Sequence, residues 1–139
     1  MPITQSDVLY TAVATAENGR DGRVATDDGR LDVVVNPPKE MGGSGSGTNP
    51  EQLFAAGYSA CFQGALGVVA RQEGADVSGS TVTARVGIGR NDEGFGIIVE
   101  ISADIPNADE ATARELLEKA HQVCPYSKAT RGNISVTLV

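Results

Sequence analysis

The sequence is poor in residues on which several protein classes depend. Its 139 residues include two cysteines, one histidine and three lysines, and the net charge is −7. Nucleic-acid binding depends on phosphate neutralisation by Lys and Arg, so we expect no nucleic-acid partner. The opening residues, MPITQSDVLYTA, lack the basic and apolar regions of a signal peptide. We therefore expect a cytoplasmic protein, and in that compartment a structural disulfide between the two cysteines is not expected.

Long apolar runs are also scarce. We expect every apolar run to be shorter than the roughly 18 uncharged residues that suggest a membrane-spanning helix, so we expect no membrane association. The remaining composition, 40% hydrophobic and 21% charged residues, is that of a globular protein. A chain of this length buries about two-thirds of its unfolded surface and needs neither metal nor disulfide to fold. We predict a single domain over residues 1–139.

The first third of the chain predicts three short strands and a loop. Residues 8–16 (VLYTAVATA) are rich in β-branched and aromatic residues, and shorter runs of this kind lie at 23–26 and 31–35. Turn-forming residues separate them, which predicts an antiparallel meander. Prolines and glycines crowd residues 36–49, which predicts a long loop without regular structure. Loops of this length inside a domain are often functional.

A helix is predicted over residues 50–73, because Asn49 and Pro50 suit a helix start. Small and apolar residues recur in it at spacings of three and four, which predicts one apolar face with Cys61 at its middle. The members of this face are Leu53, Phe54, Gly57, Ala60, Cys61, Gly64, Ala65, Val68 and Val69.

The remaining residues predict a hairpin, a second helix and a last strand. The hairpin joins residues 81–89 to 94–105, the helix runs from about Asn107 to Pro125, and the strand covers residues 133–139. The complete order is βββ-α-ββ-α-β. This predicts an α+β fold in which two main helices pack on antiparallel sheets.

Two familiar motifs are incomplete in this chain. GYSAC, residues 57–61, comes within one residue of the G-x-S-x-G nucleophile elbow, with Cys61 in place of the last glycine. That elbow needs a strand before its serine, and here the preceding residues are helical. We interpret Ser59 as a helix residue whose hydroxyl bonds the preceding turn. The glycine-rich loop lacks the Gly-Lys-Ser/Thr sequence of a phosphate-binding loop.

The two cysteines leave three readings open. Cys61, His121 and Cys124 include the residue types of a zinc site, but nothing in the sequence suggests residues that would orient such ligands, so we expect no metal. The cysteines can also be inert core residues. As a reactive thiol, Cys61 would need a cation, because burial raises the pKa of a thiol. Arg20 and Arg23 can supply one, and Glu51 can hold an arginine in a two-pronged pair.

Four segments resemble the organic hydroperoxide resistance proteins, the Ohr branch of the OsmC-like family. They are VLYTAVATAENGRDG, GTNPEQLFAAGYSACFQGAL, RVGIG with GFGIIVE, and KAHQVCPYSKATRGNISVTLV, in this order along nearly the whole chain. The resemblance implies an OsmC-like fold and an intertwined homodimer.

The resemblance also implies a thiol peroxidase. Cys61 would attack the peroxide and become a sulfenic acid, and Cys124 would resolve it as a disulfide. Arg20, in GRDG, would stabilise the thiolate, and Glu51 would hold Arg20. A lipoylated dithiol protein would be the reductant, with no metal or other cofactor. The apolar helix face suits an alkyl hydroperoxide, with Phe54 and Phe95 as candidate pocket residues. A peroxide sensor and a module that binds a small apolar ligand remain as alternatives.

Overall fold

The computed structural model describes residues 1–139, which form two compact units, Met1–Pro50 and Glu51–Val139. The single domain over residues 1–139 stays a prediction. The α+β class is confirmed, with three helices of α type rather than two.

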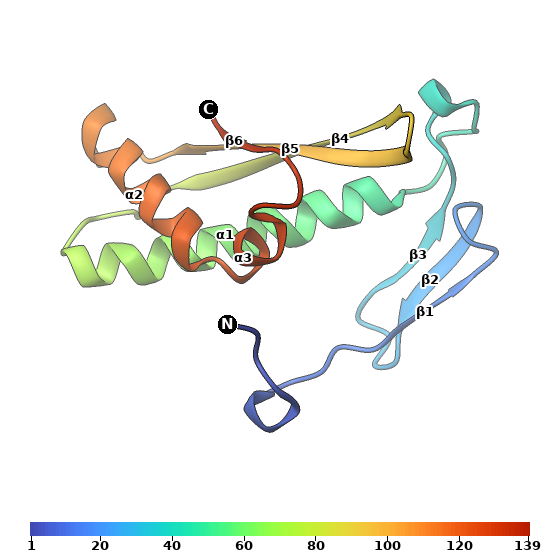
Figure 1. Cartoon of the computed structure of the whole chain (residues 1–139), viewed down its shortest axis with the longest axis horizontal. Helices are drawn as coiled ribbons and strands as arrows, with labels where there is room; N and C mark the ends of the chain where they lie inside the picture. The colour runs from blue at the N-terminus through green and yellow to red at the C-terminus, as the bar shows by residue number, and fades with distance from the viewer. The chain divides into compact units, whose positions relative to one another are not determined.

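The N-terminal unit is a three-stranded antiparallel meander in the order β1-β2-β3 (Figure 1). Its strands are β1 (Ala14–Glu17), β2 (Gly22–Thr26) and β3 (Asp32–Val35). The predicted meander is confirmed. The predicted strand over residues 8–16 is wrong for its first two-thirds, because β1 begins only at Ala14. The ladder between β1 and β2 runs from Glu17↔Arg23 to Ala14↔Thr26, where β2 ends. A strand extends only as far as its partner, so the residues before Ala14 stay outside the sheet despite their composition.

Short turns of 3₁₀ helix flank this sheet. η1 (Gln5–Asp7) is held by the Asp7 carboxylate, which accepts hydrogen bonds from the Thr4 backbone N–H at 2.8 Å and the Thr4 hydroxyl at 2.9 Å. η2 (Lys39–Met41) lies inside the predicted loop, which is therefore not wholly irregular. The end of that loop returns to the sheet through a parallel bridge between Val35 and Thr48.

The C-terminal unit has helices against one face of a second sheet (Figure 1). Its elements are α1 (Pro50–Glu73), β4 (Thr81–Asn91), β5 (Gly94–Asp104), α2 (Glu110–Val123), α3 (Pro125–Thr130) and β6 (Val136–Leu138). The predicted hairpin is confirmed, with a ladder from Thr81↔Asp104 to Asn91↔Gly94. β6 pairs with β5 in parallel, so this sheet is mixed. That direction follows from the helical crossover between β5 and β6.

Helix α2 begins one turn later than predicted. Asp109 is its N-cap, and the Asp109 carboxylate accepts a hydrogen bond from the Thr112 N–H at 2.8 Å. Pro125 follows the end of α2 as predicted, and it also opens α3, a helix that was not predicted. Proline suits the first position of a helix as well as the end of the one before it.

The core lies between α1, α2 and the sheet. Its fully buried side chains include Tyr58, Phe62 and Leu66 of α1, and Val99 and Ile101 of β5. The buried face of α1 is thus rotated about the helix axis relative to the predicted face, since Gly64 and Val68 of the predicted face are exposed. Small residues made the predicted face look buried, whereas the larger side chains take the core positions.

Helix α1 is long and apolar enough, by length and composition, to cross a membrane. The expectation that no apolar run reaches this length is therefore wrong. The same test is passed by core helices of soluble proteins, and α1 supplies five of the twelve residues of the buried hydrophobic cluster in its own unit. Tyr58, Phe62 and Leu66 of α1 are fully buried in that cluster.

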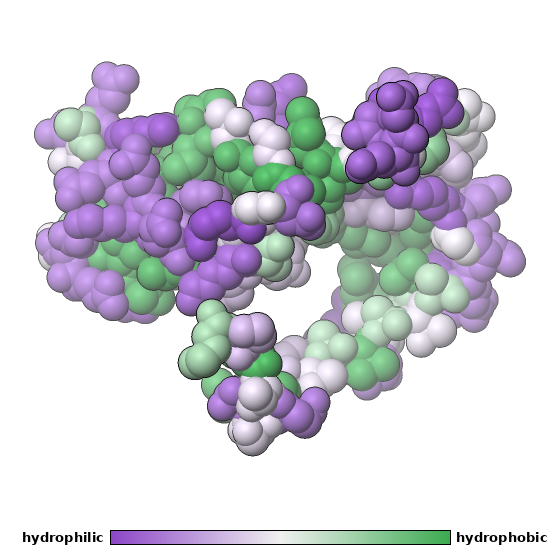
Figure 2. All heavy atoms as spheres, in the orientation of Figure 1, coloured by the Kyte–Doolittle hydropathy of each residue, from purple (hydrophilic) through white to green (hydrophobic).

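The N-terminal unit buries little by itself. All four residues of β1 are exposed, and Val35 is the one apolar residue of the unit that is fully buried. Leu9 and Tyr10, before β1, are 100% and 78% exposed. Figure 2 shows green, hydrophobic atoms at the surface of this segment. A three-stranded sheet without a buried face is not stable alone in water, so this unit needs a cover.

Candidate active site

Helix α1 presents Cys61 at the border of its buried face. The thiol is half-buried, between the fully buried neighbours Tyr58 and Phe62. Tyr58 precedes Cys61 by one turn and therefore points to the same side of the helix. Cys61 is thus held on a rigid element next to the core.

Cys124 lies where α2 ends and α3 begins. It has extended backbone dihedral angles, φ −62° and ψ 124°, and it is both the C-cap of α2 and the N-cap of α3. Its side chain is fully buried, and its sulfur lies 3.7 Å from the Cys61 sulfur. Both cysteines are free thiols. Two cysteines that are 63 positions apart in the chain therefore meet inside one compact unit.

The surroundings of Cys61 act on its ionisation in two directions. Burial raises the pKa of the Cys61 thiol above its ordinary value, and the neighbouring Cys124 thiol adds to this rise. A hydrogen bond from the backbone N–H of Tyr126 opposes it, because this donor stabilises the thiolate. These groups of the C-terminal unit leave the Cys61 pKa raised, so a reactive thiolate requires a further positive charge.

The same unit has an apolar cavity of about 590 Å³, which neither cysteine lines but Tyr126 does. Tyr126 connects this cavity to the thiol pair, because its N–H reaches Cys61 while the residue also lines the cavity. Phe54 lines it from α1, with its ring centroid 6.2 Å from that of Tyr126. Phe95 does not line this cavity. It is 66% exposed on β5, and the Arg90 guanidinium lies 5.6 Å from its ring centroid.

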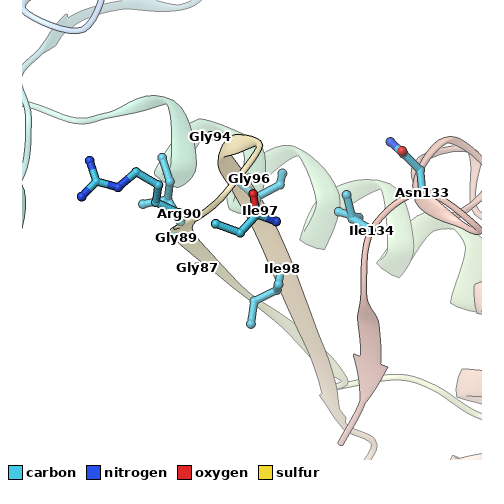
Figure 3. Close-up of a pocket in the computed structure, with 11 residues that line it drawn as sticks. Gly87, Gly89, Arg90, Gly94, Gly96, Ile97, Ile98, Asn133 and Ile134 are labelled. Carbon is cyan, nitrogen blue, oxygen red and sulfur yellow. The ribbon is translucent and has the colours of Figure 1, made fainter.

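A second hollow of about 440 Å³ continues from this cavity along the hairpin (Figure 3). Both hollows are lined by Gly96, Ile97, Asn133 and Ile134. The second one extends past Gly87 and Gly89, whose missing side chains leave the sheet surface open. Together they form an elongated apolar groove that begins at Phe54 and Tyr126.

Arg20 and Glu51 are placed by local structure. Arg20 lies in the turn between β1 and β2, which begins with two left-handed residues, Asn18 at φ 58° and Gly19 at φ 57°. Glu51 lies in the first turn of α1, ten residues before Cys61. Ten helical residues span about 15 Å along the axis. Arg20 belongs to the N-terminal unit and Cys61 to the C-terminal one, so their meeting stays a prediction.

Arg23, the other candidate cation, has a partner within its own sheet. Its guanidinium donates to both carboxylate oxygens of Asp32, at 2.7 and 2.6 Å, across the β2–β3 pair. This is the two-pronged geometry that suits arginine and carboxylate. The pair raises the pKa of Arg23 and lowers that of Asp32, so both stay charged at neutral pH.

Ser59 and His121 are occupied by structural bonds. The Ser59 hydroxyl donates to the Ala56 carbonyl at 3.0 Å, which confirms its reading as a helix residue. His121 is part-buried in the last turn of α2, and its Nδ1 lies 2.8 Å from the Ser127 hydroxyl. No three side chains of His, Cys, Asp or Glu gather in a geometry that could hold a metal ion.

Sequence reasoning missed the role of the segment after Cys124. Tyr126 supplies the N–H at Cys61, and its ring packs on Phe54 and Tyr58. Gly57 makes room for it, because a Cβ there would come within 2.9 Å of the Tyr126 hydroxyl oxygen. Gly64, in contrast, leaves open space, because a Cβ there would meet nothing within 4 Å.

Comparisons with known proteins place this chain in a family. Residues 43–139 match the family model of the OsmC-like proteins. An organic hydroperoxide resistance protein from Xanthomonas axonopodis pv. citri (strain 306) is 55% identical over 133 residues, which is 94% of each chain.

Solved structures agree with this match. An organic hydroperoxide resistance protein from Elizabethkingia anophelis has a TM-score of 0.89 at 52% identity, covering 95% of this chain and 96% of its own. OhrB of Bacillus subtilis has a TM-score of 0.86 at 44% identity, covering 94% and 98%. The chain belongs to the OsmC-like family, in its organic hydroperoxide resistance branch.

Proposed function

We propose that this protein protects against organic hydroperoxides as a thiol-dependent peroxidase, in the response to oxidative stress. The observation that carries the proposal is the 3.7 Å separation of the Cys61 and Cys124 sulfurs, which Tyr126 links to an apolar cavity. The family membership supports the same role, since the relatives are named for resistance to organic hydroperoxides.

The reaction follows from the two thiols. The Cys61 thiolate attacks the outer oxygen of ROOH, the O–O bond breaks, and a proton converts the leaving alkoxide into ROH. Cys61 is oxidised to a sulfenic acid and the peroxide is reduced to an alcohol. The Cys124 thiol then condenses with the sulfenic acid, which forms the Cys61–Cys124 disulfide and releases water. An external dithiol reduces this disulfide and becomes a cyclic disulfide itself.

The groove selects the substrate class in this proposal. Its lining by Phe54, Ile97, Tyr126 and Ile134 suits an alkyl or aryl tail, whereas hydrogen peroxide gains nothing from an apolar wall. The peroxide end would lie at Tyr126 and Cys61. The tail would follow the groove away from the thiols.

Arg20 and Glu51 complete the proposed site. Because burial raises the Cys61 pKa, a nearby guanidinium would offset that rise and also stabilise the developing alkoxide. Arg20 is the candidate named by the family resemblance. Glu51 would hold it in place by a charged hydrogen-bonded pair.

Arg20→Ala is expected to raise the Cys61 pKa and slow the alkylation of Cys61 by iodoacetamide at neutral pH. A cation favours the thiolate, so its loss moves the rise of the rate–pH curve to higher pH. Arg23→Ala is the matched control, because Arg23 pairs with Asp32 and its loss should leave the curve in place. Superimposable curves for Arg20→Ala and the unmodified protein would remove Arg20 from the site.

The proposed partners follow the family resemblance. A lipoylated protein would supply the dithiol, and no metal or cofactor takes part in any step above. A second copy of the chain would cover the exposed apolar residues of the N-terminal unit, as an intertwined homodimer. A molar mass of one chain in solution would contradict the dimer. The proposed compartment is the cytoplasm.

The test of the function is a free-thiol count on the reduced protein, before and after one equivalent of cumene hydroperoxide. We expect two thiols to fall to none within seconds, and dihydrolipoamide to restore both. Survival of both thiols would contradict the proposal. The groove would then favour a module that binds a small apolar ligand, which a ligand screen would identify.

A peroxide sensor is the second candidate, because the same disulfide could serve as a signal. Turnover separates the two functions. A peroxidase consumes many equivalents of hydroperoxide when a dithiol is supplied, whereas a sensor needs to react only once.

A further inference from the structure

Four side chains behind the thiol pair form one continuous set of hydrogen bonds, which we call the hydroxyl chain. His121 Nδ1 lies 2.8 Å from Ser127 Oγ, and Ser127 Oγ lies 2.8 Å from the Tyr58 hydroxyl. The Tyr58 hydroxyl lies 3.1 Å from Thr130 Oγ1, which donates to the Ser127 carbonyl at 3.2 Å. Tyr58 and Ser127 are fully buried.

The number of available protons determines which group donates in each hydrogen bond of the hydroxyl chain. A carbonyl can only accept, so the Thr130 proton goes to the Ser127 carbonyl, and Thr130 Oγ1 must accept from Tyr58. The single Tyr58 proton is then used, so Ser127 donates to Tyr58 and accepts from His121. His121 therefore carries its proton on Nδ1. Burial, and then the charge of Arg131, lower the His121 pKa, which keeps the ring neutral at neutral pH.

The hydroxyl chain joins the elements that carry the two thiols. Tyr58 lies on α1, one turn before Cys61, while Ser127 and Thr130 lie on α3, directly after Cys124. The bond from His121 to Ser127 bridges the α2–α3 junction over Cys124. Arg131 bridges the same α2–α3 junction with a second hydrogen bond, because its Nη2 donates to the His121 carbonyl at 2.6 Å.

We propose that the hydroxyl chain is a positioning device for the thiol pair, which holds α3 on α1 so that the Tyr126 N–H and the Cys124 sulfur stay at Cys61. Tyr58, Ser127 and His121 are positioning residues that lie outside the lining of the groove. Thr130 also lines the groove, so its positioning role is separated from contact with the peroxide by an oxidant that does not need the groove. A helix of six residues has little stability of its own, so α3 depends on such contacts to keep its place. This inference rests on the proposed peroxidase function for its catalytic consequence.

That consequence is a choice between two fates of the Cys61 sulfenic acid. Condensation with the Cys124 thiol forms the disulfide and water, and the sulfurs must close from 3.7 Å to the bond length of about 2.0 Å. A second hydroperoxide molecule would instead oxidise the sulfenic acid to a sulfinic acid and leave as an alcohol. A fixed Cys124 favours condensation, because the thiols are already in place.

The experiment measures this partition in Tyr58→Phe and in the pair Thr130→Val and Thr130→Ser. Thr130→Val keeps the shape of the side chain and removes the hydroxyl, whereas Thr130→Ser keeps the hydroxyl. Ser59→Ala is the matched control, because it removes an α1 hydroxyl that bonds only the preceding turn. Mass spectrometry after treatment with excess cumene hydroperoxide gives the ratio of disulfide to sulfinic acid.

We expect the ratio to fall several-fold in Tyr58→Phe and Thr130→Val, and to stay unchanged in Thr130→Ser and Ser59→Ala. The ratio does not depend on how fast Cys61 is first oxidised, because it compares two fates of the same sulfenic acid. Ratios like that of the unmodified protein in both Tyr58→Phe and Thr130→Val would overturn the proposal. Should Tyr58→Phe not fold, the comparison of Thr130→Val with Thr130→Ser decides.

Oxidation by diamide separates this inference from the proposed function. Diamide takes two electrons and two protons from a pair of thiols and leaves a disulfide, so it reports on thiol placement without any peroxide. We expect slower disulfide formation in Thr130→Val than in Thr130→Ser with this reagent too. A protein that does not consume hydroperoxide but shows this difference would refute the peroxidase function and keep the positioning device. Equal diamide rates would refute the device.

Discussion

Cys61→Ser should abolish the reduction of cumene hydroperoxide, with a loss of several orders of magnitude in kcat/KM. Every step proposed above passes through the Cys61 sulfur, and a serine hydroxyl in the same place neither ionises at neutral pH nor attacks an O–O bond. The change is nearly isosteric at a half-buried position, so the fold should persist. The measurement is hydroperoxide consumption with dihydrolipoamide as reductant, alongside a melting curve.

Ser59→Ala is the control that separates the thiol from the incomplete G-x-S-x-G motif. The Ser59 hydroxyl is used within α1, so its loss should leave turnover intact. Turnover that survives in Cys61→Ser and disappears in Ser59→Ala would assign the chemistry to the serine and contradict the thiol mechanism.

Cys124→Ser should change the outcome of the reaction rather than its start. The variant keeps Cys61, so each chain should still reduce one equivalent of hydroperoxide and form a sulfenic acid. Without a second thiol at 3.7 Å no internal disulfide follows, and the reaction should stall after this burst. A rapid-quench assay of alcohol formed per chain measures the burst, and dimedone labels the trapped sulfenic acid.

Cys124 is fully buried, so Cys124→Ala is a useful companion that does not bury a new hydroxyl. Both variants should behave alike. Multiple turnovers with a lipoyl dithiol in either one would mean that the reductant reaches the Cys61 sulfenic acid directly, and that Cys124 is not needed as a resolving residue.

Local signals in the sequence were sufficient for much of the fold. The start of α1 at Pro50, the β4–β5 hairpin and the short β2 and β3 strands follow from propensities and turn residues. The strand over residues 8–16 was predicted too long because its length is set by where its partner β2 ends, and the composition of residues 8–16 does not show that limit. α3 was missed because one proline both ends a helix and begins the next.

The site was predictable only in part, because some of its contacts depend on long-range packing. Residue chemistry alone left Cys61 and Cys124 as core residues, metal ligands or a reactive pair, and the family resemblance chose among these. Tyr58, Ser127 and Thr130 carried no signal, since an isolated hydroxyl looks the same whether it faces solvent or a buried partner. Their meeting depends on α3 folding back onto α1, which is a long-range event.

The closeness of two sulfurs that lie 63 positions apart in the chain also affects how long the protein survives. A disulfide between them closes a loop large enough to disfavour the unfolded state by about 4 kcal/mol, by loop-closure entropy. The oxidised form should therefore melt at a higher temperature than the reduced form and resist proteases longer. A cell short of dithiol would accumulate the protein in its stable, inactive disulfide form, which becomes active again when reductant is restored.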